Sequence, residues 1–525
     1  MRRLLLAGAA LVTSALLGPW SPVHAAPDST TFTRDVAPIL NAKCVTCHRA
    51  GEVAPMALLT YQDARPYARA IKEKVASRQM PPWFADKSAG TFANDPSLTD
   101  AEIATITRWV DAGAPQGDPK DMPKPPQFTE GWQLGEPDQI IELPEVQIPA
   151  TGGDYFPTPS LTPDLKEDRW IRAIEIRPSN RQITHHSVIF SASIDMMRQT
   201  GTFDVLGVWA VGTPATVYPE GSGRWIRKGQ MLRTNLHYHP NGTPQTDRTR
   251  IGLYFGKGEL KKEVAAGLAG NLLFTIPANA PNHELRAVYV ADQDINIVSF
   301  FPHMHLRGRD MTMTASFPGG RKETLLHVPA YDFNWQLFYY PKNKVALPKG
   351  TRLDLVAHYD NSAANRNNPD ASKPVRFGEA STAEMMFGMF EFTAANGVSP
   401  TPSTERTRMT ALLSSFPDRS AFLIEVPFGP EPTLSVFHLP RSGEGASLYW
   451  TTVGPLIGPG PVQDLKWDGN AFAFQTALLG GRGAGFYNVT GTVEADGTVK
   501  GTMRRRGPTQ PPSYDFTGTA TAPAK

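Results

Sequence analysis

The sequence predicts a multidomain protein in which a small all-α domain is followed by an all-β region and a C-terminal β-rich domain. Residues 31–117 carry helical patterns with helix-start and helix-stop signals, which favour an all-α unit. From residue 135 onward the chain changes to short alternating runs separated by Gly, Pro and Asn, a pattern typical of antiparallel strands. The length of 525 residues suggests three or four domains, and Pro-containing breaks at 118–134 and 396–404 mark boundaries between them.

Residues 1–25 are predicted to be an export signal peptide. The start MRR is followed by the apolar run LLLAGAALVTSALL and by small residues that lead to a cleavage site after Ala25. A membrane anchor is the alternative, but Gly18 and Pro19 cut the apolar run below the length that spans a bilayer. The two arginines lack the rest of a twin-arginine signal, which favours the Sec route. We therefore expect an exported mature chain without a membrane span.

The chain has only two cysteines, and both lie in the stretch KCVTCHRA as Cys44 and Cys47, directly before His48. In this Cys-x-x-Cys-His pattern the thiols attach haem covalently and the histidine becomes the proximal iron ligand. A thioredoxin-like pair would need a βαβ context, whereas the apolar segment before Cys44 shows no strand pattern. A disulfide across so short a spacing would constrain almost nothing. The stretch therefore predicts one haem c, which together with the signal peptide indicates a bacterial periplasmic or secreted protein.

The helical region contains a second candidate haem ligand. Its best helix pattern is TDAEIATITRWVDAGAP, in which Thr99 and Glu102 form a capping box and Gly113 ends the helix. Before it lies SRQMPPWF, where Met80 could supply the sixth ligand of the iron; the alternative is a methionine of the domain core. The MPPW loop followed by this helix resembles a family of bacterial c-type cytochrome domains in which that methionine is the ligand. The resemblance implies that residues 31–117 form a cytochrome c-like electron carrier, and the Pro-rich stretch after it is the linker.

Six of the twelve histidines fall into three clusters within the β region. The clusters are THHSVIF with His185 and His186, LHYHPNG with His237 and His239, and FPHMHLRGRD with His303 and His305. A strand places residues i and i+2 on one face, so the second and third clusters each offer two imidazoles to one metal. His185 and His186 point to opposite faces of a regular strand and could share a metal only at a bulge or a strand end. Each histidine alone is more often structural, but three clusters together favour metal binding.

These clusters, with a Glu-Met pair after them, resemble the copper type II, ascorbate-dependent monooxygenases, the family of dopamine β-hydroxylase and peptidylglycine α-hydroxylating monooxygenase. The resemblance covers roughly residues 135–395 and includes the stretches YDFNWQ, at 331–336, and STAEMMFGMFEF. It implies two tandem jelly-roll-like β-sandwiches, at 135–276 and 277–395. It also implies that two copper ions are bound in addition to the haem.

The same resemblance implies two sets of copper ligands. The electron-transfer copper would be held by His185, His186 and His237, and the oxygen-activating copper by His303, His305 and Met385. Imidazole suits both oxidation states of copper, and the soft thioether favours Cu(I). Zinc is possible by ligand type, but a methionine ligand argues against it. His239 shares a strand face with His237 and is the alternative third ligand of the first copper.

The chain departs from that family in two ways. The family's animal members are disulfide-rich, whereas this chain has no cysteine beyond the haem motif. At the positions that hold a peptide carboxylate in the amidating enzyme, this chain has Phe301, Phe387 and Met389. We therefore expect an apolar pocket beside the second copper, which disfavours a peptide C-terminus as substrate. The alternative is that these three are ordinary core residues and that the substrate enters elsewhere.

The predicted function is hydroxylation of a C–H bond in a small, apolar or aromatic substrate by O₂, with electrons delivered through the haem. The donor would be an exported redox protein or a small reductant such as ascorbate. The rival prediction is a non-catalytic electron-transfer or copper-binding protein on the same scaffold. The net charge of +2 gives no indication of a nucleic-acid partner. Residues 405–523 carry no identifiable chemistry beyond a hairpin that turns at Asp496 and Gly497; a cover, an interaction module and a small barrel are all open.

Overall fold

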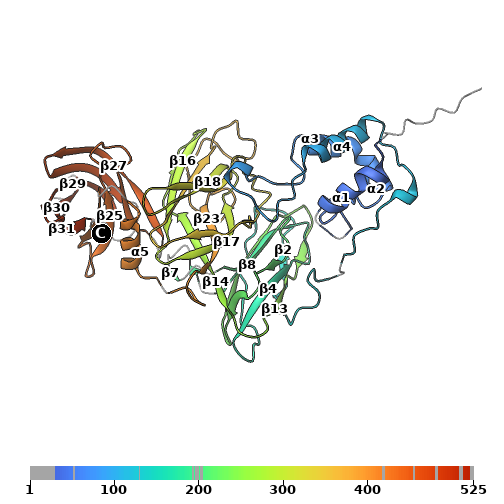
Figure 1. The fold of residues 1–525 in the computed structure, drawn as a ribbon, viewed down its shortest axis with the longest axis horizontal. Helices are drawn as coiled ribbons and strands as arrows, with labels where there is room; N and C mark the ends of the chain where they lie inside the picture. Colours follow the sequence, from blue (N-terminus) through green and yellow to red (C-terminus); the bar gives the residue numbers. More distant parts are fainter. Residues whose placement is uncertain are drawn as a thin grey trace, which may run out of the picture.

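The computed structural model describes residues 30–520. Within that range it leaves out 51, 53, 129–130, 192–193, 196–199, 202–204, 402, 417–419, 453–455, 479–482 and 508–511. The predicted signal peptide, 1–25, therefore lies outside the described residues. Among the residues that are described, no helix combines the length and the apolar character needed to cross a membrane. The N-terminal helices lie at one end of the molecule's long axis and a C-terminal barrel at the other, with the β-rich body between them (Figure 1).

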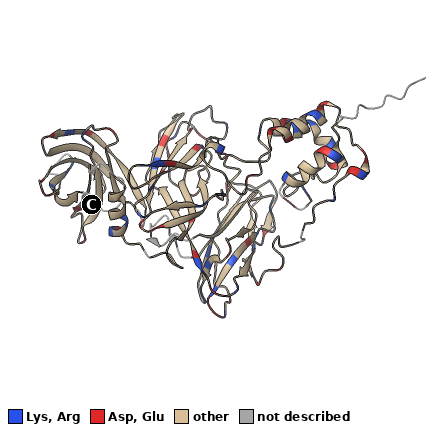
Figure 2. Cartoon of the chain, in the orientation of Figure 1, with Lys and Arg blue, Asp and Glu red and all other residues tan. Residues whose placement is uncertain are grey.

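The N-terminal unit is helical, as predicted. Its helices are η1 (Phe32–Val36), α1 (Ala37–Lys43), α2 (Tyr61–Ala64), η2 (Arg65–Tyr67), α3 (Ala68–Ala76), η3 (Lys87–Ala89), α4 (Asp100–Asp111) and, in the linker that follows, η4 (Pro119–Asp121). The capping box of α4 is confirmed, because Thr99 and Glu102 each accept the other's backbone N–H through their side chains. Trp109 of α4 is fully buried and packs with Phe32 in the core of this unit. Basic and acidic side chains are interspersed over these helices (Figure 2), in keeping with the small net charge.

One segment of the helical unit leaves its own core. Residues 81–95, between α3 and α4, extend away from the helices and pack on the β-rich body. Ala85 and Phe92 are buried in the core of the second sandwich described below, and Trp83 is partly buried against it. We call residues 81–95 the docking arm. The arm means that the helical unit and the body are joined by packing and not only by the linker.

The first half of the body is a two-layer β-sandwich. One layer contains β1 (Gln139–Glu142), β4 (Arg169–Arg177), β9 (Thr216–Val217), β10 (Ser222–Ile226) and β13 (Arg250–Phe255). The other contains β3 (Ser160–Leu161), β5 (Thr184–Phe190), β8 (Val205–Ala210) and β11 (Leu232–Tyr238). Alternating residues from both layers, such as Ile174 and Leu236, fill the core between them. Short strand pairs flank the layers: β2 (Val146–Ile148) with β12 (Gln245–Asp247), and β6 (Ile194–Asp195) with β7 (Thr200–Gly201).

The second half of the body is another two-layer sandwich. One layer contains β14 (Lys262–Asn271), β17 (Ile295–His303), β20 (Val345–Leu347) and β23 (Met386–Ala394). The other contains β16 (His283–Val290), β18 (Gly308–Ser316), β19 (Lys322–Val328) and β21 (Arg352–Tyr359), with β15 (Thr275–Ile276) and β22 (Val375–Arg376) paired beside them. β10 and β14 pair in parallel, so a single nine-stranded sheet runs through both sandwiches. β14 precedes residue 276 in the chain, but its residues Val264–Asn271 pair with β23 of the second sandwich.

The last segment begins with a helix that the sequence analysis did not predict and continues as a closed barrel. The helix, α5 (Glu405–Ser414), starts at a Thr404 cap and buries Met409 and Leu412. The barrel strands are β24 (Ala421–Val426), β25 (Thr433–His438), β26 (Ser447–Thr451), β27 (Ile457–Asp468), β28 (Ala471–Leu478), β29 (Gly485–Val493), β30 (Thr498–Arg505) and β31 (Ser513–Ala520). Pairing of β24 with β31 and of β27 with β28 closes the ring. The expected β29–β30 hairpin is confirmed, with Gly497 at a φ of +86° in its turn. Of the three alternatives, this segment is the small barrel.

Candidate metal centres

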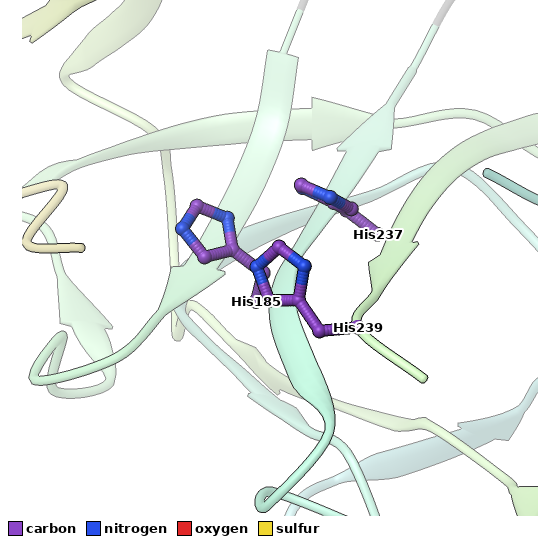
Figure 3. A group of neighbouring side chains, drawn as sticks. All are labelled: His185, His237 and His239. Atoms are coloured by element: carbon purple, nitrogen blue, oxygen red, sulfur yellow. The ribbon is translucent and has the colours of Figure 1, made fainter. Parts of the chain in front are cut away.

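The first histidine group forms where β5 and β11 lie side by side. His237 pairs with His186 and Tyr238 pairs with Thr184, so His185 is an extra residue without a partner in the ladder. This is a β-bulge, the irregularity that two adjacent histidines need in order to face one site. One side-chain nitrogen each from His185, His237 and His239 lie within 4.8 Å of one another. The three rings are turned toward a common point (Figure 3).

His186 belongs to the same group. Its Nδ1 lies 3.3 Å from His185 Nδ1, and its ring centroid lies 4.9 Å from that of His237. The structure therefore gathers four imidazoles and brings both alternatives for the third ligand, His237 and His239, to one place. They differ in exposure, because His237 is 1% exposed and the His239 side chain is 46% exposed. An imidazole nitrogen without a hydrogen-bond partner costs more free energy when it is buried than when it is exposed. A metal ion at this site would therefore stabilise His237 more than His239.

The chemistry of these rings fits a metal ion. His185 Nε2 and His237 Nδ1 are buried and have no hydrogen-bond partner within the described part of the chain. Burial lowers the pKa of His185 and His186 well below its usual value and also lowers that of His237. The rings are therefore neutral near pH 7 and each has a lone pair to donate. Clustered, unprotonated imidazoles that lack protein partners are what copper or zinc would require.

Asp154 is a part of this group that sequence reasoning missed. Its carboxylate lies 2.6 Å from His239 Nδ1 and 3.2 Å from His237 Nε2, and it accepts a hydrogen bond from the Ser381 hydroxyl. Burial raises the pKa of Asp154, but hydrogen bonds from His237, His239 and Ser381 outweigh burial and hold it below its usual range. Ser381 lies in the second sandwich, so this carboxylate also ties the two sandwiches together. A single aspartate in the loop TGGDYF carries no motif that could have identified it.

The second histidine group lies at the end of β17. His303 is the last residue of that strand, and Met385 directly precedes the neighbouring strand β23. The pairing of His303 with Phe387 brings the two chain segments together. His303, His305 and Met385 all line one cavity of about 70 Å³. The structure thus brings together all three residues of the second predicted ligand set.

The two imidazoles of this group are held in one orientation. His303 Nδ1 lies 2.8 Å from Gln336 Oε1, and His305 Nδ1 lies 3.3 Å from the Ala383 carbonyl oxygen. Each Nδ1–H donates to an oxygen, which leaves Nε2 with the free lone pair, the usual arrangement of histidines that bind metals. Burial lowers the pKa of His303 to about 4 and that of His305 to about 3. Gln336 closes the YDFNWQ stretch, so the sequence had indicated the segment but not the contact.

Glu384, the residue before Met385, supports the second group through hydrogen bonds to the backbone around His305. Its carboxylate is fully buried and accepts the backbone N–H groups of His305 at 2.8 Å and of Arg307 at 2.7 Å. Burial raises the pKa of Glu384 to about 8, while these N–H groups and the Arg307 charge oppose the shift. The contacts fix the turn that carries His305 against the start of β23. They explain in physical terms why a glutamate precedes the methionine.

The two groups face each other at the junction of the sandwiches. Phe333 stacks on His185 with ring centroids 4.4 Å apart, and its edge meets His305 at 5.5 Å. His186, from the first group, lines the same cavity as His303 and His305. The remaining lining is largely apolar and includes Phe156, Val188, Phe190, Val208, Phe301, Phe387 and Met389. The cavity is therefore a small, largely apolar space with imidazoles on two sides, and its other polar lining residues are Asn235, Gln336 and Glu379.

Comparison of the sequence with known proteins finds a distant relative. No family model matches the chain. It is 22% identical over 319 residues to DBH-like monooxygenase protein 1 of Homo sapiens, a match that covers 51% of each protein. The chain is distantly similar to a DBH-like monooxygenase. It spans about half the length of the curated relative it matches, and the similarity suggests an oxidoreductase of that kind.

The Cys-x-x-Cys-His motif lies in the helical unit, apart from the two histidine groups. Cys44 follows α1 directly, and the N–H groups of Cys47 and His48 both donate to the Cys44 carbonyl. Both thiols are free and partly exposed, and burial raises the pKa of the Cys44 thiol to about 12. Among the described residues, helices and no strand precede Cys44, so the βαβ context that a thioredoxin-like pair would need is not present there.

The ring of His48 also suits an iron ligand. Its Nδ1 lies 3.2 Å from the Met56 carbonyl oxygen, which leaves Nε2 free to bind a metal. Met80 lies on a separate segment after α3, where its N–H donates to the Lys74 carbonyl at 3.2 Å. Its assignment as the sixth ligand therefore stays a prediction that rests on the MPPW motif.

Proposed function

We propose that this protein is an exported, copper-dependent monooxygenase that hydroxylates a C–H bond of a small apolar or aromatic substrate, with electrons delivered through a covalent haem c. The observation that carries the proposal is the convergence of His303, His305 and Met385 on one apolar cavity that also reaches the first histidine group. The distant similarity to a DBH-like monooxygenase supports the same reaction class. Bound copper would supply the oxygen chemistry of the overall reaction R–H + O₂ + 2e⁻ + 2H⁺ → R–OH + H₂O.

Each group of residues has a separate task in this proposal. His185, His186 and His237 hold the first copper, with His239 and Asp154 beside it. The second copper is held by His303, His305 and Met385, whose thioether favours the reduced ion that meets O₂. Gln336 and Glu384 hold the second set in place through hydrogen bonds. Locked rings lose little entropy when a metal binds, and they keep the cavity side of each imidazole open.

The cavity supports an apolar substrate. Phe301, Phe387 and Met389 line it, and Phe301 and Phe387 are nearly fully buried, at 4% exposure each. No arginine or lysine is among its lining residues in the described chain, so a substrate carboxylate would lack a counter-charge there. Apolar walls also exclude water from the reacting C–H bond. A small aromatic or aliphatic compound fits this environment better than a peptide.

In this proposal the helical unit brings electrons. Cys44 and Cys47 attach the haem, and His48 and Met80 bind its iron, so that a low-spin, one-electron carrier results. Electrons would come from an exported redox protein or from a small reductant such as ascorbate. A filled sixth position keeps the iron from binding O₂ itself. We infer that the protein acts in the bacterial periplasm or is secreted, since haem c is attached outside the cytoplasm.

The test is product formation by the protein loaded with copper and haem. The protein is reduced without O₂ and then exposed to O₂ with a panel of small aromatic and aliphatic compounds, and the products are identified by mass spectrometry. We expect a hydroxylated product from Met386→Leu but at least about 100-fold less from Met385→Leu, since even partners outside the ligand shell cost 10–100-fold. Met386 is the matched control because it is fully buried in the second sandwich core, away from the cavity.

Two outcomes would contradict the proposal. Equal loss of product in Met385→Leu and Met386→Leu would remove Met385 from the ligand set. Full copper occupancy with no product from any compound would favour the rival, a non-catalytic electron-transfer or copper-binding protein. Thermal unfolding of both variants controls for folding, because a Met-to-Leu exchange in a core usually costs less than about 1.5 kcal/mol.

A further inference from the structure

The docking arm makes an aromatic contact with the second sandwich. The ring centroids of Trp83 and Tyr339 are 4.9 Å apart, and Phe92 meets the same tyrosine at 5.5 Å. All three rings cross at steep angles, between 62° and 64°. Such edge-to-face contacts are favourable beyond their area alone. Tyr339 is 2% exposed, so the arm covers a residue that belongs to the sandwich core.

Backbone and amide hydrogen bonds fix the arm in place. The Asn94 side chain donates to the Phe338 carbonyl at 2.7 Å and accepts the Tyr340 N–H at 3.1 Å. The Ala93 N–H donates to the Tyr340 carbonyl at 2.8 Å, and the Lys342 N–H to the Thr91 carbonyl at 2.9 Å. The arm is thus bonded on both sides of the Phe338–Tyr340 segment. These hydrogen bonds join the helical unit to the second sandwich in a defined geometry.

From this junction, close contacts continue to the second histidine group. Tyr339 exchanges both backbone hydrogen bonds with Phe300, at 2.8 and 2.9 Å. Phe300 is three residues before His303 on the same strand, β17. A parallel route runs through rings, because Phe338 stacks on Phe301 at 4.4 Å and Phe301 stacks on His303 at 6.4 Å. Both routes end at the imidazole of His303.

The other end of the arm begins at the candidate haem ligand. Only Pro81 and Pro82 separate Met80 from Trp83. The helical unit also reaches the first sandwich, but by a different contact. There Glu52 of the helical unit forms an ion pair with Arg181 of the first sandwich, four residues before His185. Glu52 also pairs with Arg49 of its own unit at 2.8 Å. Within the described residues, the helical unit reaches toward the first histidine group through the Glu52–Arg181 ion pair and toward the second through edge-to-face rings and backbone hydrogen bonds.

We propose that the docking arm is the electron route from the haem to the second metal group, with the Trp83–Tyr339 contact as its crossing point. The inference rests on the proposed function, in which the chain binds haem and copper. In the step one electron moves, Fe(II) becoming Fe(III) and Cu(II) becoming Cu(I), and no atom or proton is transferred. Electron transfer decays steeply across gaps and less steeply through bonded or touching atoms, so the residues between Met80 and His303 set its rate. By this route the second group can be reduced even when the first group is absent.

The test uses a protein that lacks the first group. In the background His185→Ala, His186→Ala, His237→Ala, elemental analysis should find one copper and one haem. The haem is reduced and the copper oxidised without O₂ or substrate; stopped-flow absorption then follows the haem, and freeze-quench EPR follows Cu(II). We expect each haem to lose one electron as one Cu(II) signal disappears. Adding Trp83→Leu should slow this at least about tenfold, while Trp83→Phe should restore most of the rate.

A matched variant separates the two junctions. Glu52→Gln weakens the ion-pair junction with the first sandwich and should leave the rate in this background unchanged. If the haem is oxidised only when the first group is intact, or if Glu52→Gln slows the step and Trp83→Leu does not, the arm is not the route, although haem-fed copper still stands. If the haem stays reduced in the unaltered protein as well, both the arm and the proposed haem feed are wrong.

Discussion

Asp154 shows how much of a metal site is decided outside its ligands. The carboxylate touches His237 and His239 of the first group and Ser381 of the other sandwich. A negative charge at this position fixes ring orientation and raises the basicity of the imidazoles that it contacts. It therefore acts on the metal through the rings, and we regard it as a positioning residue.

We predict that Asp154→Asn weakens the first copper about 10- to 100-fold, the usual cost of losing a partner of a ligand. The second copper should keep its affinity, since its rings bond to Gln336 and the Ala383 carbonyl instead. Competition titration with a copper chelator measures both affinities. Asp164→Asn, at an exposed carboxylate paired only with Lys166, is the control. Equal weakening of both coppers, or of neither, would show that Asp154 does not belong to the first site.

At this scale the sequence identified the residues but not how they meet. The i and i+2 spacing predicted that His237 lies with His239 and His303 with His305. In the structure each pair spans a strand end instead of sharing a strand face, because β11 ends at Tyr238 and β17 ends at His303. The bulge at His185 depends on the register of β5 against β11, which a single segment does not encode. Asp154 comes from a loop far along the chain, and nothing in its immediate neighbours distinguishes it from an ordinary surface aspartate.

Among the elements, the docking arm offers a direct test of how much its hydrogen bonds contribute to stability. We predict that Asn94→Ala lowers the free energy of unfolding by about 1–3 kcal/mol, because the Phe338 carbonyl and the Tyr340 N–H each lose a partner. Hydrogen exchange at the Ala93 and Lys342 amides should accelerate at the same time. Asn367→Ala, at an exposed asparagine of another loop, should change neither. Unaltered exchange at Ala93 in Asn94→Ala would mean that the arm is held by its aromatic rings alone.

Elements with local signals were predicted, and those fixed by tertiary contacts were not. The capping box of α4 and the Asp496–Gly497 turn follow from neighbouring residues alone and are confirmed. Helix α5 was missed because it follows a Pro-containing segment that resembles a linker, although its buried residues Met409, Leu412 and Leu413 have helical spacing. The buried residues of α5 pack on Val288 and Val290 of β16. Closure of the barrel depends on pairs between distant strands, which no hairpin signal reveals.

For the whole molecule, the ligand sets predict a definite metal content. Protein matured with haem and copper should contain two copper ions and one haem per chain by elemental analysis and optical absorption. Removing copper with a chelator should leave the haem in place, since a haem c at this motif would be bound through thioethers to Cys44 and Cys47. Zinc at full occupancy in copper-replete medium, or a single metal besides iron, would contradict the assignment of two copper sites.

At the scale of the whole molecule, the helical unit that carries the Cys-x-x-Cys-His motif packs on both halves of a β-rich body that holds the two histidine groups. The sequence predicted the order of these parts, because motif, linker and β pattern follow one another along the chain. It could not predict that residues 81–95 would leave the helical core and join the second sandwich, since the partner residues lie more than two hundred positions away. The proposed function therefore depends on whether electrons that enter at the haem are used to hydroxylate the substrate.

Isotope labelling with a protein electron donor measures directly whether electrons from the haem are used for hydroxylation. The protein is supplied with substrate, ¹⁸O₂ and a reduced redox protein as the sole electron donor, and the product is analysed by mass spectrometry. We expect one ¹⁸O atom in the hydroxylated product and two donor electrons consumed for each product formed. The variant Cys44→Ala, Cys47→Ala should give no product with the protein donor but should still give it with ascorbate. Labelled product from the haem-free variant with the protein donor, at the rate of the unaltered chain, would contradict the account.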